Sequence, residues 1–143
     1  MESCTGGAFA NAITSVPGAS EVYLGGSVCY SRQAKIRAGV PAGTLVRFGV
    51  YSRHTALAMA RVARSRAPGG DIGIGITGTL TRPDPNAPDS VPGVVFIAVC
   101  TASGCATREE DAGREGTREQ QKARVVAAAV DLLLGVVSGD PRF

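Results

Sequence analysis

A serine, a cysteine and two glycines stand together near the start of the chain, in the stretch ESCTGG at residues 2–7. The apolar residues that follow recur at helical spacing, which predicts an amphipathic helix beginning at or just after Ser3. The first turn of a helix presents unpaired N–H groups and a partial positive charge. Ser3 is therefore a candidate nucleophile beside an oxyanion site, or part of a phosphate site, and the ordinary alternative is a helix N-cap.

A serine nucleophile needs a base, and the chain offers few. The single histidine, His54, falls in the first turn of a helix with a surface pattern, so a Ser-His-Asp triad is poorly supported. Lys35 directly follows a predicted extended segment, at an edge where sheets commonly carry sites. To act as a base, its pKa must fall from about 10.4 to about 7, roughly 4 kcal/mol, which requires burial or nearby positive charge. The ordinary alternative is a lysine at the surface.

The four cysteines show no CxxC spacing and are accompanied by one histidine, which argues against a zinc site or any other metal site. We expect all four to be reduced thiols. Cys100 and Cys105 flank a plausible hairpin turn and could face each other, but in a reducing compartment that pairing does not imply a disulfide.

No apolar stretch approaches a membrane span and no signal architecture is visible, so we expect a soluble cytoplasmic protein.

The composition favours one globular domain over residues 1–143, since 44% of the residues are hydrophobic and the length suits a single core. The formal net charge of +3 is mild, and charges of both signs are interspersed. Aromatic residues make up 5% of the chain and tryptophan is absent from the sequence. A basic stripe and a base-stacking surface are both lacking, which argues against nucleic-acid binding.

The order of predicted elements indicates how these residues are positioned. Helices are expected from about residue 3 to Val16, from Ser52 to residues 68–70 and over 117–137; extended segments over 20–31, 71–78, 94–100 and 105–111; a helical turn and connector over 32–49; and a proline-rich loop over 81–93. Buried strands interleaved with helices, and a last strand pair joined by a short turn, predict a three-layer α/β domain with a mixed sheet.

Four of these stretches carry a resemblance to a known family. ESCTGG, YSRQAK at residues 30–35, ITG at 76–78 and GTREQQK at 116–122 stand in the order and spacing of the C-terminal domain of the CinA family, the nicotinamide-nucleotide amidase domain. The resemblance covers nearly the whole chain. It implies an α/β/α sandwich with a mixed sheet, often dimeric, that hydrolyses the carboxamide of nicotinamide mononucleotide to nicotinate mononucleotide and ammonia without a metal or other cofactor.

The resemblance also assigns roles to single residues. It implies that Ser3 is the nucleophile and Lys35 its general base, with Tyr30 and Thr77 relaying the proton or positioning the amide. It implies that the nucleotide is held by Thr5, Gly6, Gly7, Gly78 and Arg118. Attack by an activated serine would give an acyl-enzyme, with helix N–H groups near residues 4–6 holding the oxyanion. The expected partners are a small nucleotide substrate and a second copy of the chain.

The sequence also departs from the family pattern. The family has a helix and a core strand before ESCTGG, and this first strand is apparently missing here. A proline-rich loop over 79–92 replaces glycine-rich backbone, Thr117 stands in place of an aspartate, and Lys122 in place of an arginine. Two alternatives follow: a catalytically inactive nucleotide-binding or dimerisation module of the same fold, and an enzyme whose nucleophile is Cys4 instead of Ser3.

Overall fold

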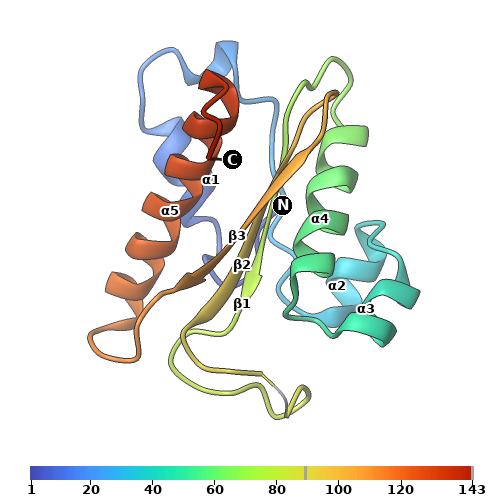
Figure 1. Cartoon of the computed structure of the whole chain (residues 1–143), viewed down its shortest axis with the longest axis vertical. Coiled ribbons are helices and arrows are strands. Elements are labelled where there is room, and N and C mark those ends of the chain that lie inside the picture. The colour runs from blue at the N-terminus through green and yellow to red at the C-terminus, as the bar shows by residue number, and fades with distance from the viewer. Residues whose placement is uncertain (89, 143) are drawn as a thin grey trace.

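The computed structural model describes residues 1–88 and 90–142, so Asp89 in the proline-rich loop and Phe143 at the end of the predicted domain lie outside the described residues. Figure 1 shows the arrangement of the elements. In chain order they are α1 (Ala8–Thr14), the 3-10 helix η1 (Ala19–Glu21), α2 (Arg32–Arg37), α3 (Ala42–Phe48), α4 (Arg53–Ser65), β1 (Gly73–Gly78), β2 (Val94–Cys100), β3 (Cys105–Asp111) and α5 (Arg118–Ser138).

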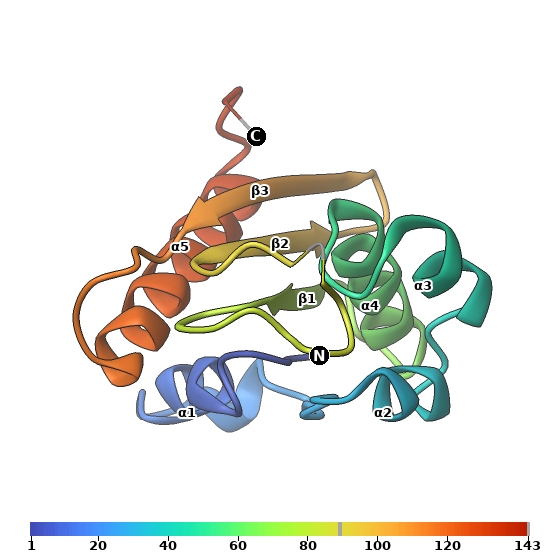
Figure 2. The same ribbon diagram turned by 90° about the horizontal axis from the view of Figure 1, so that it is seen from below.

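Three layers are present, as the sequence predicts. The strands lie in the order β1-β2-β3 and each neighbouring pair is antiparallel. Helices α1 and α5 lie on one side of the sheet, while α2, α3 and α4 lie on the other (Figures 1 and 2). The α/β/α class predicted from the order of elements is therefore confirmed.

The first two residues extend this sheet. The Met1 nitrogen donates to the Ile74 carbonyl at 2.7 Å, and the Met1 carbonyl accepts from the Ile76 N–H at 3.1 Å, which is the pattern of a parallel pair. Glu2 forms a parallel bridge to Val28 on the other side. Residues 1–2 thus lie between β1 and the segment around Val28, which makes the pairing mixed. These two paired residues lead directly into Ser3.

The face of β1 toward α4 is made of glycine. A side-chain Cβ at Gly73 would collide with the Ala60 carbonyl, and one at Gly75 with the Ala56 carbonyl. The two glycines therefore allow the backbones of strand and helix to come together, as the alternation of isoleucine and glycine predicts. Helix α4 begins at the predicted N-cap, because the Ser52 side chain accepts the Thr55 N–H at 3.1 Å.

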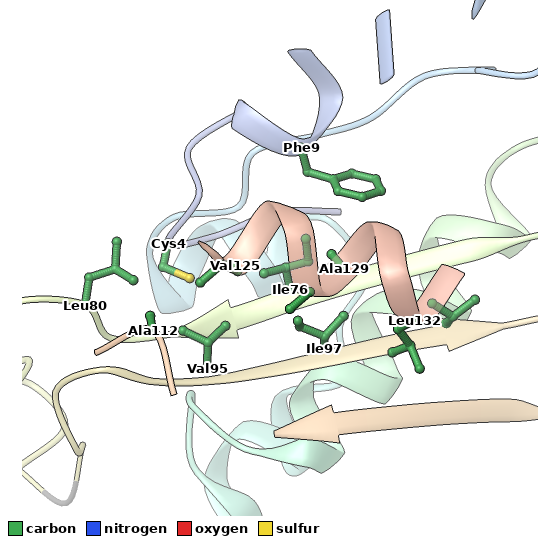
Figure 3. Close-up of a cluster of buried hydrophobic side chains, with 12 residues drawn as sticks. Cys4, Phe9, Ile76, Leu80, Val95, Ile97, Ala112, Val125, Ala129 and Leu132 are labelled. Atoms are coloured by element: carbon green, nitrogen blue, oxygen red, sulfur yellow. The ribbon is translucent and has the colours of Figure 1, made fainter. Parts of the chain in front are cut away.

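The opposite face of the sheet carries the main core, together with α1 and α5 (Figure 3). Its buried members are Cys4, Phe9, Ile76, Leu80, Val95, Ile97, Val99, Ala112, Val125, Ala128, Ala129 and Leu132. Helix α5 begins with a capping box between Thr117 and Gln120. Its apolar stripe then faces the sheet, which fixes the side chains of its first turn at the end of the sheet where Ser3 lies.

Two predicted elements differ in the structure. The first helix begins at Ala8 instead of near Ser3, because Gly6 and Gly7 have φ of 62° and 99°, left-handed values that a helix cannot contain. Residues 20–31, predicted as one extended segment, hold only the end of η1 and the single bridge at Val28. The connector over 32–49 folds into two short helices, α2 and α3.

The cysteine prediction is wrong for one pair. Cys100 and Cys105 form a disulfide, since they stand directly opposite each other where β2 and β3 meet at their turn. Cys4 and Cys29 are free and buried. The cysteine content therefore no longer argues for a reducing compartment.

Within residues 1–88 and 90–142, no helix combines the length and the apolar character that crossing a membrane would require.

Candidate active site

Ser3 and Lys35 meet in the interior. The Lys35 ammonium nitrogen lies 2.8 Å from Ser3 Oγ and donates a second hydrogen bond to the Cys29 carbonyl at 2.9 Å. Lys35 is 0% exposed and Ser3 is 2% exposed. The structure therefore brings together the two residues to which the resemblance assigns the nucleophile and the base, although they are separated by the whole of α1 and η1 in the sequence.

Burial changes the acid–base chemistry of Lys35. Desolvation disfavours the charged ammonium and lowers the pKa of Lys35 to about 8, against the smaller opposing effects of Cys29, Cys4 and Asp84. At pH 7 an amine with this pKa is neutral in about a tenth of molecules, and in that form it can accept a proton from an adjacent hydroxyl.

Short local signals hold Lys35 in place. Helix α2 begins after Ser31, whose side chain accepts the Ala34 N–H at 3.1 Å. Lys35 follows in the first turns of α2 and is the one residue of this helix that is buried. The capped helix thus directs one long side chain inward, to the Cys29 carbonyl and Ser3.

The turn after Ser3 differs from the expected helix start. The Gly6 N–H donates to the Ser3 carbonyl at 3.0 Å, closing a tight turn. This N–H is therefore already engaged. Of the oxyanion donors predicted over residues 4–6, those of Cys4 and Thr5 remain, and both also interact with the Cys4 side chain. The Thr5 hydroxyl is also engaged, because it donates to the Glu2 carboxylate at 2.6 Å.

Cys4 is a poor alternative to Ser3. It is 3% exposed and belongs to the apolar core between the sheet and α5. Burial raises the pKa of its thiol to about 11, although Lys35 acts weakly in the opposite direction. A thiol with that pKa is almost wholly protonated at neutral pH and therefore weakly nucleophilic.

Tyr30 lies near the pair, but its hydroxyl is bonded elsewhere. Arg118 donates to the Tyr30 hydroxyl at 2.8 Å and to the Thr81 hydroxyl at 3.1 Å. The Tyr30 ring is 57% exposed, and it is the backbone carbonyl of Tyr30 that lies 3.5 Å from Ser3 Oγ. Arg118 thus links α5 to the segment before α2 at the edge of the site.

Thr77 and Gly78 serve the sheet in this structure. The Thr77 hydroxyl is fully buried and donates to the Val50 carbonyl at 3.0 Å, so it is bonded to neither Ser3 nor Lys35. A Cβ at Gly78 would press against the Val94 carbonyl and Val95. Both residues lie at the end of β1 nearest the site, and these contacts give each of them a packing role.

A cavity of about 630 Å³ lies between the starts of α1 and α5, and neither Ser3 nor Lys35 is among its lining residues. Its lining residues are Ala8, Arg118, Glu119, Lys122, Ala123 and Val126. Lys122 also reaches the turn after Ser3, because a Cβ on Gly6 would lie 3.5 Å from its ammonium nitrogen. Two cationic side chains, Arg118 and Lys122, therefore border a space large enough for a nucleotide.

Two further residues join the site that the sequence alone did not single out. The Tyr51 hydroxyl donates to Asp84 at 2.6 Å, and this hydrogen bond lowers the pKa of the Asp84 carboxyl. The pKa of Tyr51 is raised, by burial first and by this aspartate second. Asp84 interacts electrostatically with Lys35, and Tyr51 interacts with Tyr30 and Cys4. No local pattern marks them, because they come from a loop before α4 and from the proline-rich loop.

Across the described parts of the chain, no group of three or more histidine, cysteine, aspartate or glutamate side chains is placed to hold a metal ion. His54 is exposed and stacks on Phe48, with ring centroids 3.8 Å apart. It is therefore unavailable to Ser3, which leaves Lys35 as the basic side chain in contact with the serine.

The molecule is thus a three-layer α/β domain with a buried serine–lysine pair at one end of its sheet. The sequence model of the CinA C-terminal domain matches residues 1–137, and the chain belongs to this family. CinA-like proteins of Geobacter metallireducens and Anaeromyxobacter dehalogenans are 38% and 41% identical to it over 133 residues, or 92% of this chain. The alignments cover 31% and 32% of those proteins, so the chain spans about a third of their length.

Solved structures of CinA-family proteins have the same fold as this chain. The competence/damage inducible protein CihA from Agrobacterium tumefaciens superposes with a TM-score of 0.82 at 34% identity, covering 94% of this chain and 81% of that one. The competence damage-inducible protein A from Klebsiella pneumoniae gives a TM-score of 0.85 at 27% identity, covering 96% and 83%. The resemblance seen in the sequence motifs is therefore confirmed at the level of family and fold.

Proposed function

We propose that this domain is an amidohydrolase that deamidates nicotinamide mononucleotide to nicotinate mononucleotide and ammonia. The observation that carries the proposal is the 2.8 Å contact between Lys35 and Ser3, both buried, with the pKa of Lys35 lowered by burial to about 8. A buried lysine is costly to a fold, so a lysine held against a serine in the interior favours a chemical role over a structural one.

The proposed reaction proceeds in two halves. Neutral Lys35 accepts the proton of the Ser3 hydroxyl as the oxygen attacks the carboxamide carbon, and it then gives that proton to the departing nitrogen, which leaves as ammonia. Water next attacks the resulting ester with Lys35 again as base, releasing the nicotinate product and regenerating Ser3. The N–H groups of Cys4 and Thr5 are the candidate oxyanion donors.

The cavity supports a phosphorylated substrate. Arg118 and Lys122 line it together, and a guanidinium fork paired with an ammonium suits a phosphate group. Asp84 supplies negative charge near Lys35 for the cationic pyridinium ring. The substrate identity itself comes from the family resemblance. We also propose a cytoplasmic location, because a charged phosphate ester does not cross membranes unaided. The homodimer implied by the family resemblance is part of the same proposal.

The test is ammonia release from nicotinamide mononucleotide by the wild-type chain and by Ser3→Ala. We expect Ser3→Ala to lose activity by at least about 10³-fold while remaining folded, since the nucleophile is removed. Cys4→Ala is the matched control at the next residue and should retain turnover. Full turnover by Ser3→Ala would refute the serine mechanism, and loss in Cys4→Ala alone would transfer the role to the thiol.

A second candidate function is nucleotide binding without turnover. The observation in its favour is that the hydroxyls of Tyr30 and Thr77 are bonded to Arg118 and to the Val50 carbonyl, so neither assists the pair. Calorimetry with nicotinamide mononucleotide, run beside the ammonia assay, separates the two. Binding without ammonia release would favour the inactive module, and binding with release would favour the amidase.

A further inference from the structure

Glu2 is a buried carboxylate that stands directly before the proposed nucleophile. It is 4% exposed. One of its oxygens, Oε2, accepts from the Thr5 hydroxyl at 2.6 Å and from the N–H groups of Gly7 and Phe9 at 3.1 Å each. The other, Oε1, accepts from the Ala10 N–H at 2.8 Å. Four hydrogen bonds thus satisfy a charge that would otherwise be costly to bury.

These four donors tie the serine turn to α1. The N-cap of α1 is Gly7, which has no side chain with which to cap the helix. Glu2 supplies the missing acceptor from outside, so that its carboxylate clasps both the turn after Ser3 and the first residues of the helix. Ser3 lies within the segment of residues 2–10 whose two ends these hydrogen bonds join. Rotation or sliding of the turn would therefore break several hydrogen bonds at once.

The backbone of Glu2 reaches the other partner. Its carbonyl accepts the Cys29 N–H at 2.7 Å, and the Cys29 carbonyl in turn accepts from Lys35 at 2.9 Å. The side chain of Glu2 therefore fixes the turn that carries Ser3, while its main chain fixes the residue that orients Lys35. A single residue connects both members of the pair.

We infer that Glu2 is a positioning residue, whose carboxylate holds the turn over residues 3–7 and thereby sets the approach of Ser3 to Lys35. The inference rests on the proposed function and extends it to a residue whose side chain is hydrogen-bonded to the serine turn and to α1 instead of to Lys35. A displacement of about 1 Å in an active site can reduce the rate about 10²-fold, so a loosened turn should slow chemistry without weakening substrate binding.

The test removes the hydrogen bonds of the Glu2 carboxylate in steps, using variants of the full chain. Glu2→Gln keeps the shape but turns an N–H donor toward the Ala10 N–H, Thr5→Val removes one donor and leaves the carboxylate, and Glu2→Ala removes all four bonds. We expect kcat to fall by about 10²-fold in Glu2→Ala and less in the other two, with KM changed less than about two-fold. Glu21→Gln, the same exchange at an exposed position, is the matched control and should change nothing.

Three readouts separate positioning from simple stabilisation and from failure of the proposed function. The rate at which a fluorophosphonate labels Ser3, followed by intact mass, should fall in parallel with kcat, and hydrogen exchange at the Phe9 and Ala10 amides should rise. The pH midpoint of activity should stay in place, since Glu2 is not among the groups that shift the pKa of Lys35.

Folded Glu2→Gln and Thr5→Val variants with unchanged kcat and unchanged labelling would overturn the inference. A wild-type chain that labels at Ser3 without hydrolysing nicotinamide mononucleotide would refute the substrate alone, and the labelling series would still decide the role of Glu2. A wild-type chain that does neither would overturn the serine mechanism and the positioning role with it.

Discussion

At the scale of single residues, the burial of Lys35 lowers the stability of the fold and at the same time favours the neutral amine that the proposed reaction needs. Its side chain is fully buried and hydrogen-bonded to Ser3 Oγ and the Cys29 carbonyl. Burial lowers the pKa of Lys35 to about 8, which means that the folded state accommodates the charged form poorly. The same desolvation that weakens the fold makes the amine available as a base.

The first prediction concerns pH. The proposed base must be neutral, so kcat/KM should rise as pH increases and reach half of its plateau near the pKa of Lys35, about 8. Rates of ammonia release from about pH 6 to 10 measure this directly. A profile that is flat over this range, or that falls as pH rises through 8, would contradict a lysine base.

A second prediction concerns the stability of Lys35→Met. The folded-state pKa of Lys35 lies below the unfolded value, so the unfolded chain binds more protons between about pH 8 and 10.4 and stability rises with pH across that window. Below about pH 8 the folded state bears the full cost of desolvating the Lys35 ammonium. Lys35→Met should therefore be inactive but about 1–3 kcal/mol more stable at pH 7, after allowance for two lost hydrogen bonds.

Denaturant unfolding of both proteins at pH 7 and at pH 9.5 checks this. The advantage of Lys35→Met should shrink at the higher pH, where the wild-type amine is already neutral. Destabilisation by the substitution at both pH values would show that the hydrogen bonds of Lys35 outweigh its desolvation.

At the scale of elements, the close contact between β1 and α4 positions the strand that leads to the site. Gly75 faces the Ala56 carbonyl with no room for a Cβ. Met1 pairs with the other edge of β1, at Ile74 and Ile76. The strand therefore sets both the position of α4 and the position of the residues that precede Ser3.

The third prediction follows from this contact. Gly75→Ala should push α4 from the sheet and reduce the free energy of unfolding by about 1–3 kcal/mol, the usual cost of overpacking. Gly43→Ala is the control, because Gly43 is an exposed position of α3 with nothing near its Cβ, and it should stabilise by about 0.5–1 kcal/mol. Equal effects of the two substitutions in chemical denaturation would show that the contact with α4 is loose.

At the scale of the whole molecule, the disulfide and the site occupy opposite ends of the sheet. Cys100 pairs with Gly73 at the beginning of β1, whereas Val95 pairs with Gly78 at its end, close to the serine turn. A link between Cys100 and Cys105 can therefore stabilise the hairpin without touching the reaction.

The fourth prediction is that Cys105→Ser lowers the free energy of unfolding by about 2 kcal/mol, as expected for a closed loop of roughly six residues, and leaves kcat unchanged. Alkylation of unfolded protein, followed by intact mass, should modify two thiols without reductant and four with it. Modification of four thiols in the absence of reductant would refute the disulfide.

Much of the fold follows from local sequence. The alternation of isoleucine and glycine defines β1, the apolar run before Cys100 defines β2, and Ser52 marks the start of α4. These features depend on neighbours within a few residues. The start of α1 was mispredicted because Ser3 has the chemistry of an N-cap, while the left-handed Gly6 and Gly7 delay the helix.

The sequence by itself determined which residue types were available, where most helices and strands run, and that Ser3 and Lys35 were the pair to consider. Tertiary structure alone decided that Lys35 is buried against Ser3, that Thr77 bonds to the Val50 carbonyl, and that Glu2 clasps the serine turn. Helix and strand patterns reflect short-range sterics and periodicity. Burial, pKa and hydrogen-bond partners depend on segments brought together from distant parts of the chain, which local pattern does not encode.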